Sequence, residues 1–344
     1  MERLPPSAIA TLAPGYFAMV MATGIIAIGA DQQGIGWLAS ALYVVAVIAY
    51  GVLGGLLGVR IVRYRQAFVA DLTDHTRGFS FLTVVAGTNV LAAASAVVHG
   101  WWTAAWVLWW VGNALWVVLV YSTLIAVVVS DHKPALGAGI NGSWFLLTVA
   151  TQSVAVVAAL LLARADRDLL AFAAIGAFTL GIVLYVIVMT MVFLRWTFHA
   201  LEPSEADPPA WIAAGAVAIS VLAGSNLLLA RDTSPRIARI APFLEGMVIM
   251  VWATATFWFP LMIAIGVWRH LVRRIPLRYH PSYWALVFPL GMYAAATYRM
   301  NTAIAIDFLD WLPRLALVSA LVAWSATFTG LLHQGLRATA RRRR

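Results

Sequence analysis

The chain has 344 residues, of which 62% are hydrophobic and 11% are charged, and its formal net charge is +9. Soluble domains carry about 25% charged residues, so this composition excludes a soluble globular domain and indicates an integral membrane protein. Repeated apolar runs of about 20 residues favour membrane helices over barrel strands. The chain contains no cysteine, which excludes disulfides and thiolate metal sites. Most of the positive charge lies between the apolar runs, so we read it as a determinant of membrane orientation and expect no nucleic-acid partner.

Hydropathy and the positions of charged, proline and glycine residues predict ten membrane spans. Taken in chain order, they are Pro14–Ala30, Trp37–Val59, Gly78–Val98, Trp101–Val129, Gly139–Ala163, Leu169–Leu194, Pro209–Ala230, Ala241–Trp268, Ser282–Met300 and Leu312–Leu332. In the second span, Gly51, Gly54, Gly55 and Gly58 form overlapping GxxxG patterns, which are typical of close helix contact.

The distribution of lysine and arginine predicts that both termini are cytoplasmic, because this orientation leaves most basic residues on the inner side. We therefore expect a short cytoplasmic N-terminus at 1–13, a transmembrane transport domain at 14–335 and a basic cytoplasmic tail at 336–344. The expected location is the plasma membrane, which in a bacterial cell is the inner membrane, with membrane lipid as a partner. No cleaved signal peptide is expected before the first span.

The odd-numbered spans begin near residues 14, 78, 139, 209 and 282, which indicates five tandem helical hairpins. The predicted fold is therefore all-α, with ten transmembrane helices in a quasi-five-fold arrangement around a central pore. Each odd span carries a small, polar segment past its midpoint, and these segments are the predicted pore lining. Their residues are Thr23, Gly24, Gly87, Thr88, Asn89, Thr151, Gln152, Gly224, Ser225, Asn226, Gly291 and Thr297. The alternative is that these small and polar residues only hold neighbouring helices together.

The ninth span carries the features that most favour a permeation path. Pro289 removes a helical hydrogen bond near the expected middle of the span and predicts a kink, and Phe288 stands beside it as a candidate gate. Arg299 closes the span near the expected outer mouth, where it would attract anions or extend to the membrane interface. Every carboxylate lies in a loop or at a span end, which favours passive conduction over proton coupling. Glu245, expected at the start of the eighth span, would complement that helix N-terminus or serve as a coupling residue.

Several stretches resemble the tellurite-resistance/dicarboxylate transporter family, which includes plant slow-type anion channels and fungal malate and sulfite transporters. The matching stretches are Pro14-Gly-Tyr-Phe-Ala-Met-Val-Met-Ala-Thr-Gly24, Arg77-Gly-Phe-Ser-Phe-Leu-Thr-Val-Val-Ala-Gly-Thr88, Trp211 through Asn226, Trp258-Phe-Pro260, Gly266-Val-Trp-Arg269, and Tyr283-Trp-Ala-Leu-Val-Phe-Pro-Leu-Gly291. The resemblance implies five hairpins around a central pore, a phenylalanine of the ninth span that plugs it, here Phe288, and a homotrimer. The plant channels also carry long cytosolic tails that are phosphorylated, whereas both tails are short here, so kinase control is not carried over.

The sequence thus predicts a gated anion channel or uniporter for small anions, such as C4-dicarboxylates, sulfite or related oxyanions, halide or nitrate. The membrane potential would favour anion efflux. The alternative is a proton-coupled malate carrier of the same fold. No HExxH motif, paired carboxylates at depth or phosphate-binding glycine loop is present, so neither an enzyme nor a cofactor is expected.

Overall fold

The computed structural model of the protein describes residues 8–162, 164–165, 168–200 and 208–342, with side chains as far as residue 337. Within these residues the regular structure is entirely helical. The first seven residues of the expected N-terminal segment and the last two of the basic tail fall outside the described residues.

Five long helices each follow a short 3₁₀ turn. The turns and helices are η1 (Pro14–Phe17) with α1 (Ala18–Gln32), η2 (Gly78–Phe81) with α4 (Leu82–His99), η3 (Gly142–Phe145) with α7 (Leu146–Leu162), η4 (Pro208–Trp211) with α9 (Ile212–Leu229), and η6 (Pro281–Tyr283) with α11 (Trp284–Ile304). The other long helices are α2 (Gly36–Arg63), α5 (Trp102–Val129), α8 (Asp168–Phe198), α10 (Pro235–Val267) and α12 (Trp311–Arg342). A π-helical turn, η5 (Trp268–Val272), continues α10, and the connections carry α3 (Arg65–Leu72) and α6 (Leu136–Gly139).

The five helices that follow 3₁₀ turns pack against one another in a closed cycle, in the order α1, α4, α7, α9, α11 and back to α1. Their 3₁₀ turns contact one another in the same order, so the cycle is already closed at the level of η1, η2, η3, η4 and η6. We call these five helices the inner ring. Alanine, glycine, serine and threonine are frequent in them, and small residues let helix backbones approach closely.

The remaining long helices form an outer layer in which each covers two neighbours of the inner ring. Helix α2 packs on α1 and α4, α5 on α4 and α7, α8 on α7 and α9, α10 on α9 and α11, and α12 on α11 and α1. Large apolar side chains such as Val52, Val118 and Phe172 are exposed on these helices. Because water penalises so much exposed apolar surface, the outer layer is suited to contact with lipid.

Nine helical segments of the described residues are long and apolar enough to cross a membrane, so the chain is a multi-span integral membrane protein. The segment expected at Ser282–Met300 is present as η6 and α11, but it is not among the nine. Tyr293, Tyr298, Arg299 and Asn301 dilute its apolar composition. Its burial between α9, α1 and α12 compensates for the lower hydropathy.

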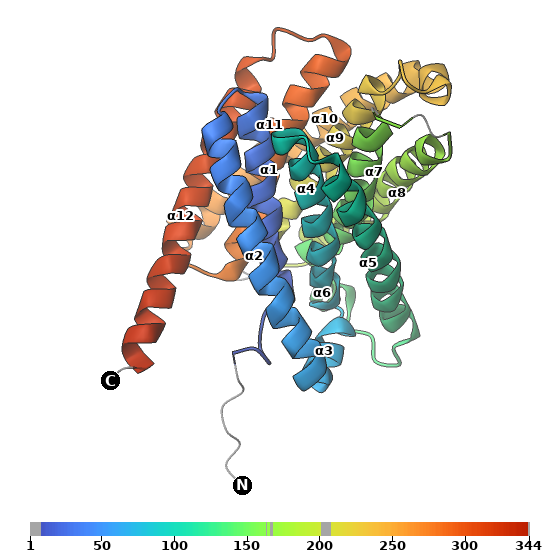
Figure 1. Ribbon diagram of the computed structural model, residues 1–344. Helices are drawn as coiled ribbons and strands as arrows, with labels where there is room; N and C mark the ends of the chain where they lie inside the picture. Colours follow the sequence, from blue (N-terminus) through green and yellow to red (C-terminus); the bar gives the residue numbers. More distant parts are fainter. Residues whose placement is uncertain (1–7, 163, 166–167, 201–207, 343–344) are drawn as a thin grey trace.

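Two local expectations are corrected, those for Glu245 and for the glycines of α2, and the structure adds a detail to the expected tail. Helix α10 begins at Pro235, so Glu245 lies well inside the helix and does not complement its N-terminus. Helix α12 continues to Arg342, so much of the expected tail is helical. The four glycines of the α2 stripe meet nothing within 4 Å of an added Cβ, so the predicted GxxxG contact is not made with another described part of this chain. Figure 1 shows the first described residues, α3 and the C-terminal end of α12 at the same end of the molecule, at the bottom of the view.

Candidate functional site

The 3₁₀ turns at the start of the inner-ring helices enclose a cavity of about 490 Å³, which we call the vestibule. Every one of the five turns contributes to its wall, and residues from the first turns of α1, α4, α7, α9 and α11 continue it inward. Its polar lining consists mainly of hydroxyl, amide and cationic groups: Thr11, Thr76, Arg77, Ser80, Thr83, Asn141, Ser143, His280 and Ser282. No carboxylate is among the described residues that line it.

The electrostatics of the vestibule favour anions. All five inner-ring helices begin there, and a helix N-terminus carries a partial positive charge together with backbone N–H groups that lack helical partners. Arg77 adds a full positive charge. His280 caps η6, where its Nδ1 accepts a hydrogen bond of 3.3 Å from the backbone N–H of Ser282.

Phe288 is the lining residue of the vestibule that lies furthest along α11. Its side chain lines the vestibule, yet the residue is only 1% exposed. Met292, one turn further along α11, lines a second cavity of only about 10 Å³. A space of that size is close to that of a single water molecule, so the passage is narrow beyond Phe288. Pro289 lies within the first two turns of α11, not near its middle as expected.

The second cavity lies on the axis of the inner ring, because all five of its helices contribute to the wall. Its lining residues are Ile25, Ile28, Asn89, Val90, Ala93, Ser153, Val156, Ile219, Leu222 and Met292. The wall is apolar except for Asn89 and Ser153, whose side chains are joined by a hydrogen bond of 3.0 Å from Nδ2 to Oγ. Of the predicted pore-lining residues, only Asn89 faces this cavity.

The predicted pore-lining threonines instead contact the outer layer. On four inner-ring helices, a threonine hydroxyl is hydrogen-bonded to an aromatic residue of the outer helix that comes before it around the ring. The pairs are Thr23 with Trp324 at 2.9 Å, Thr88 with Tyr50 at 2.9 Å, Thr151 with Trp116 at 3.0 Å and Thr297 with Trp252 at 3.2 Å. These hydroxyls, which the sequence predicted to line a pore, are therefore directed to the outer layer in this structure. Their geometry corresponds to the alternative, in which they hold helices together.

On the fifth inner-ring helix, α9, the corresponding hydroxyl is that of Ser225. It is fully buried and makes no hydrogen bond to another described residue. Asn226, which follows it, is 3% exposed, and its Oδ1 is likewise without a described partner. Gln152 donates from Nε2 to the carbonyl oxygen of Phe178 on α8 at 2.9 Å. Gln152 therefore also faces the outer layer.

The predicted glycines serve close helix contacts. A Cβ added at Gly24 would stand 2.8 Å from Val90, at Gly291 2.7 Å from Ile26, and at Gly224 2.5 Å from Val248. At Gly87 it would stand 3.6 Å from the carbonyl oxygen of Phe17, which is ordinary contact. Gly24 and Gly291 therefore allow close approach within the inner ring, and Gly224 allows the outer helix α10 to approach α9.

The two predicted charged residues lie apart from the vestibule. Arg299 is half-buried near the other end of α11, and no hydrogen bond or ion pair joins it to another described residue. It is seven residues beyond Met292, so helix periodicity places it on the face of α11 that is directed to the axis. Glu245 is exposed on the outer helix α10.

Within the described residues, no group of three or more His, Asp or Glu side chains is arranged to hold a metal ion.

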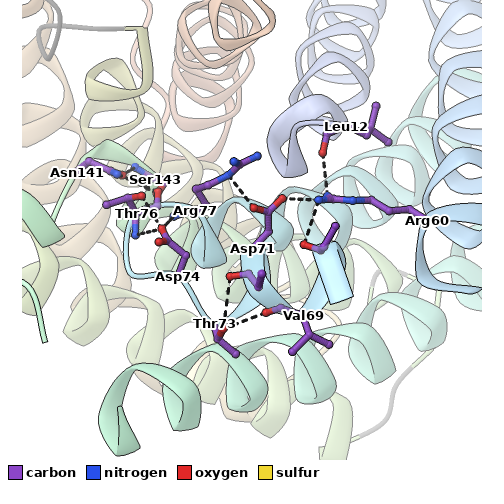
Figure 2. A network of polar contacts seen from close by, with 12 residues as sticks. Leu12, Arg60, Val69, Asp71, Thr73, Asp74, Thr76, Arg77, Asn141 and Ser143 are labelled. Carbon is purple, nitrogen blue, oxygen red and sulfur yellow. Dashed lines mark hydrogen bonds and ion pairs between the residues drawn. The ribbon is translucent and has the colours of Figure 1, made fainter. Parts of the chain in front are cut away.

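A network of charges beside the vestibule was missed by the sequence reasoning (Figure 2). Asp71 of α3 lies between two arginines: Oδ1 is 3.1 Å from Nε of Arg77, and Oδ2 pairs with Nη2 of Arg60. Arg60 is only 1% exposed and also donates to the carbonyl oxygen of Leu12 at 2.8 Å. The recurring turn sequences PGYF, GFSF, GSWF, PPAW and PSY at the helix starts are the signal that could have located the vestibule.

Asp74 fixes the loop that carries Arg77. Its Oδ1 accepts hydrogen bonds from the backbone N–H groups of Thr76 at 2.8 Å and Arg77 at 3.0 Å. Partial burial acts to raise the pKa of the Asp74 carboxyl, but the hydrogen bonds from Thr76 and Arg77 and the charge of Arg77 outweigh it and hold the pKa below its usual value. The backbone at Arg77 is therefore held by an ionised carboxylate.

Comparisons with known proteins identify one matching family and several relatives. The sequence model of the voltage-dependent anion channel (SLAC1) family matches residues 11–332. An uncharacterized transporter of Methanocaldococcus jannaschii is 23% identical over 317 residues, covering 88% of each chain. The sulfite efflux pump SSU1 of Trichophyton rubrum is 23% identical over 351 residues, covering 93% of this chain and 90% of the pump. An uncharacterized membrane protein of Mycobacterium tuberculosis is 36% identical over 150 residues, which is 44% of this chain and 76% of the relative.

Proposed function

The chain belongs to the voltage-dependent anion channel (SLAC1) family, as its sequence motifs predicted, and we propose that it passes small anions along the axis of the inner ring, with Phe288 as the gate. Family members are transporters or channels rather than enzymes. The single observation that carries the proposal is the position of Phe288. It is itself buried and lines a vestibule whose described lining has no carboxylate, and all five inner-ring helices contribute to the narrow cavity beyond it.

The electrostatics support an anion rather than a cation. A cation pathway is expected to carry acidic side chains in its mouth, whereas the described lining of the vestibule carries Arg77 and five helix N-termini. At the far end of α11, Arg299 lies on the face directed to the axis, so a second positive group stands where the anion would leave.

We further propose that all ten long helices, α11 included, cross the membrane as five hairpins. The vestibule would then face the cytoplasm, because the termini and most basic residues are placed there by the positive-inside rule. An inside-negative potential favours anion exit by about 2.3 kcal/mol per charge per 100 mV. Efflux across the plasma membrane is thus the expected direction.

Sulfite is the first substrate to test, since relatives that align along nearly the whole chain are named sulfite efflux pumps. C4-dicarboxylates, halide and nitrate remain candidates from the family resemblance. A homotrimer is also proposed from that resemblance alone, and light scattering of the purified protein in detergent tests it.

The experiment is anion flux into proteoliposomes at a potential clamped with valinomycin, comparing wild type with Phe288→Ala. We expect low flux of sulfite and chloride in the wild type, a large increase in Phe288→Ala, and no dependence on a pH gradient. Phe172→Ala is the matched control, because Phe172 is 63% exposed on the outer helix α8. Equal flux in wild type and Phe288→Ala would refute the gate. Uptake that requires a proton gradient would instead favour the proton-coupled carrier.

A further inference from the structure

We propose that Arg77 is the residue that binds a permeating oxyanion in the vestibule, and that Asp71 positions it. This inference rests on the proposed anion transport and adds to it a binding site and a substrate class. The ligand class is an anion with at least two oxygens on one centre, such as sulfite or a carboxylate.

The donors of Arg77 are available to such a ligand. The side chain lines the vestibule and is 47% exposed. Its Nε is engaged by Asp71 at 3.1 Å, but no hydrogen bond joins Nη1 or Nη2 to another described residue. Those two nitrogens form one edge of a rigid, planar group. That edge matches a pair of oxygens with two parallel hydrogen bonds.

Asp71 fixes the direction of that edge. One carboxylate oxygen of Asp71 pairs with Nε of Arg77. The other carboxylate oxygen pairs with the buried Arg60, which lies on the opposite side of Asp71 (Figure 2). The backbone is fixed as well. The side-chain amide of Asn141 donates to the carbonyl oxygen of Thr76 at 2.9 Å, and Asp74 accepts from the N–H of Arg77. The guanidinium is therefore pre-oriented before any anion arrives, which lowers the entropic cost of binding.

The charges of this cluster are balanced, so the free donors of Arg77 favour an anion more than the net charge does. Asp71 pairs with both arginines, and the charge of Arg77 also lowers the pKa of Asp74. The other carboxylate of this loop, Asp74, is exposed and accepts hydrogen bonds from Thr76 and Arg77. Ser80, three residues after Arg77, also lines the vestibule and its hydroxyl has no partner among the described residues, so it can donate to a third oxygen.

This arrangement predicts selectivity for oxyanions over halides. A halide is a single centre and gains little from a fork of two donors, whereas sulfite or a carboxylate engages both. Lysine keeps the charge of Arg77 but removes the fork. The ratio of sulfite flux to chloride flux therefore separates a binding role from a general electrostatic or structural one.

The experiment compares wild type, Arg77→Lys, Arg77→Gln and Asp71→Asn in two assays: the flux assay above, and thermal shift of the purified proteins with sulfite or chloride at constant ionic strength. Arg65→Gln is the matched control, because Arg65 is exposed on α3 and does not line the vestibule. We expect Arg77→Lys to lower the sulfite-to-chloride flux ratio about tenfold, and Arg77→Gln to lower both fluxes. In Asp71→Asn we expect a higher KM for sulfite with little change in maximal flux. The control should resemble wild type.

The outcomes distinguish this inference from the proposed function. An unchanged flux ratio in Arg77→Lys, together with robust wild-type flux, overturns the inference and leaves anion transport standing. Sulfite stabilisation that depends on Arg77, without flux of any anion, supports the site and refutes transport. If neither flux nor Arg77-dependent stabilisation is seen, the inference is overturned. Should Asp71→Asn fail to fold because Arg60 loses its buried partner, Arg77→Lys still decides, since Arg77 is half exposed.

Discussion

The ring of Phe288 on α11 lies against Gly215 of α9. A Cβ built on Gly215 would stand 3.2 Å from Cε1 of that ring and 2.8 Å from Cγ of Pro289. The gate candidate therefore rests in a space that only a glycine leaves open on the neighbouring helix.

Gly215→Ala is expected to displace the Phe288 ring and raise sulfite leak above the wild-type level, though less than Phe288→Ala does. Overpacking of this kind destabilises a protein by about 1–3 kcal/mol. We expect the Phe288 side chain to move rather than the backbone of α9, because a side chain can change its rotamer. The same proteoliposome assay measures it. In the double variant Gly215→Ala, Phe288→Ala, the glycine change should raise the leak less than it does alone, because only its contact with Pro289 remains. An undiminished increase there would mean that Gly215 does not act through Phe288.

Thr151→Val removes the hydrogen bond from Trp116, so we expect the free energy of unfolding to fall by about 0.6–2 kcal/mol. A lower Tm in thermal melts checks this. The flux ratio of sulfite to chloride should not change, because the hydroxyl faces α5 rather than the axis. Thr190→Val on the exposed face of α8 is the control, since its hydroxyl bonds only within its own helix. A changed flux ratio in Thr151→Val would return this threonine to the pore lining.

The lowered pKa of Asp74 predicts that the stability of the folded protein depends on pH. Its folded pKa lies below its usual value, so its contribution is present above the unfolded pKa of about 3.9 and is lost as the pH falls through the folded pKa. Wild type should therefore have a higher Tm than Asp74→Ala at pH 6, and the difference should shrink towards pH 3. Thermal melts of both proteins in detergent measure this difference. A gap that stays constant over that range would show that Asp74 acts without its charge.

Glu245→Gln is expected to leave both the flux and its response to a pH gradient unchanged. The side chain is exposed on the outer helix α10, away from the vestibule and the axial cavity. Flux measured with and without a pH gradient checks this. Loss of a proton-dependent component in the variant would revive the coupled carrier and assign Glu245 its coupling role.

The positions of the spans were predictable because apolar run length and the breaks around it are local properties. Nine helical segments of the described residues are long and apolar enough to cross a membrane. The bounds predicted for these spans lie close to the bounds of the helices. Local sequence also identified the stretch around Phe288. The exceptions have local causes: α10 passes through Pro242 without ending, and α11 keeps polar residues that packing buries.

The direction of each side chain around a helix was not predictable in the same way. Thr88 and Asn89 are adjacent in one polar segment, yet the hydroxyl bonds outward to Tyr50 while the amide donates to Ser153 on the neighbouring inner-ring helix α7. A polar residue in a membrane helix needs a partner, but the sequence does not say whether that partner is on the axis or in the outer layer. Only the packing of the ring decides it.

By itself, then, the sequence determined the membrane class, the positions of the spans and the family, because these depend on composition, order and local motifs. The tertiary structure alone decided which residues form the site. The vestibule is assembled from five turns far apart in the chain, and Arg77, Asp71 and Arg60 meet beside it only in the folded protein. Such a site depends on distances between helices, and those are fixed by packing around the whole ring.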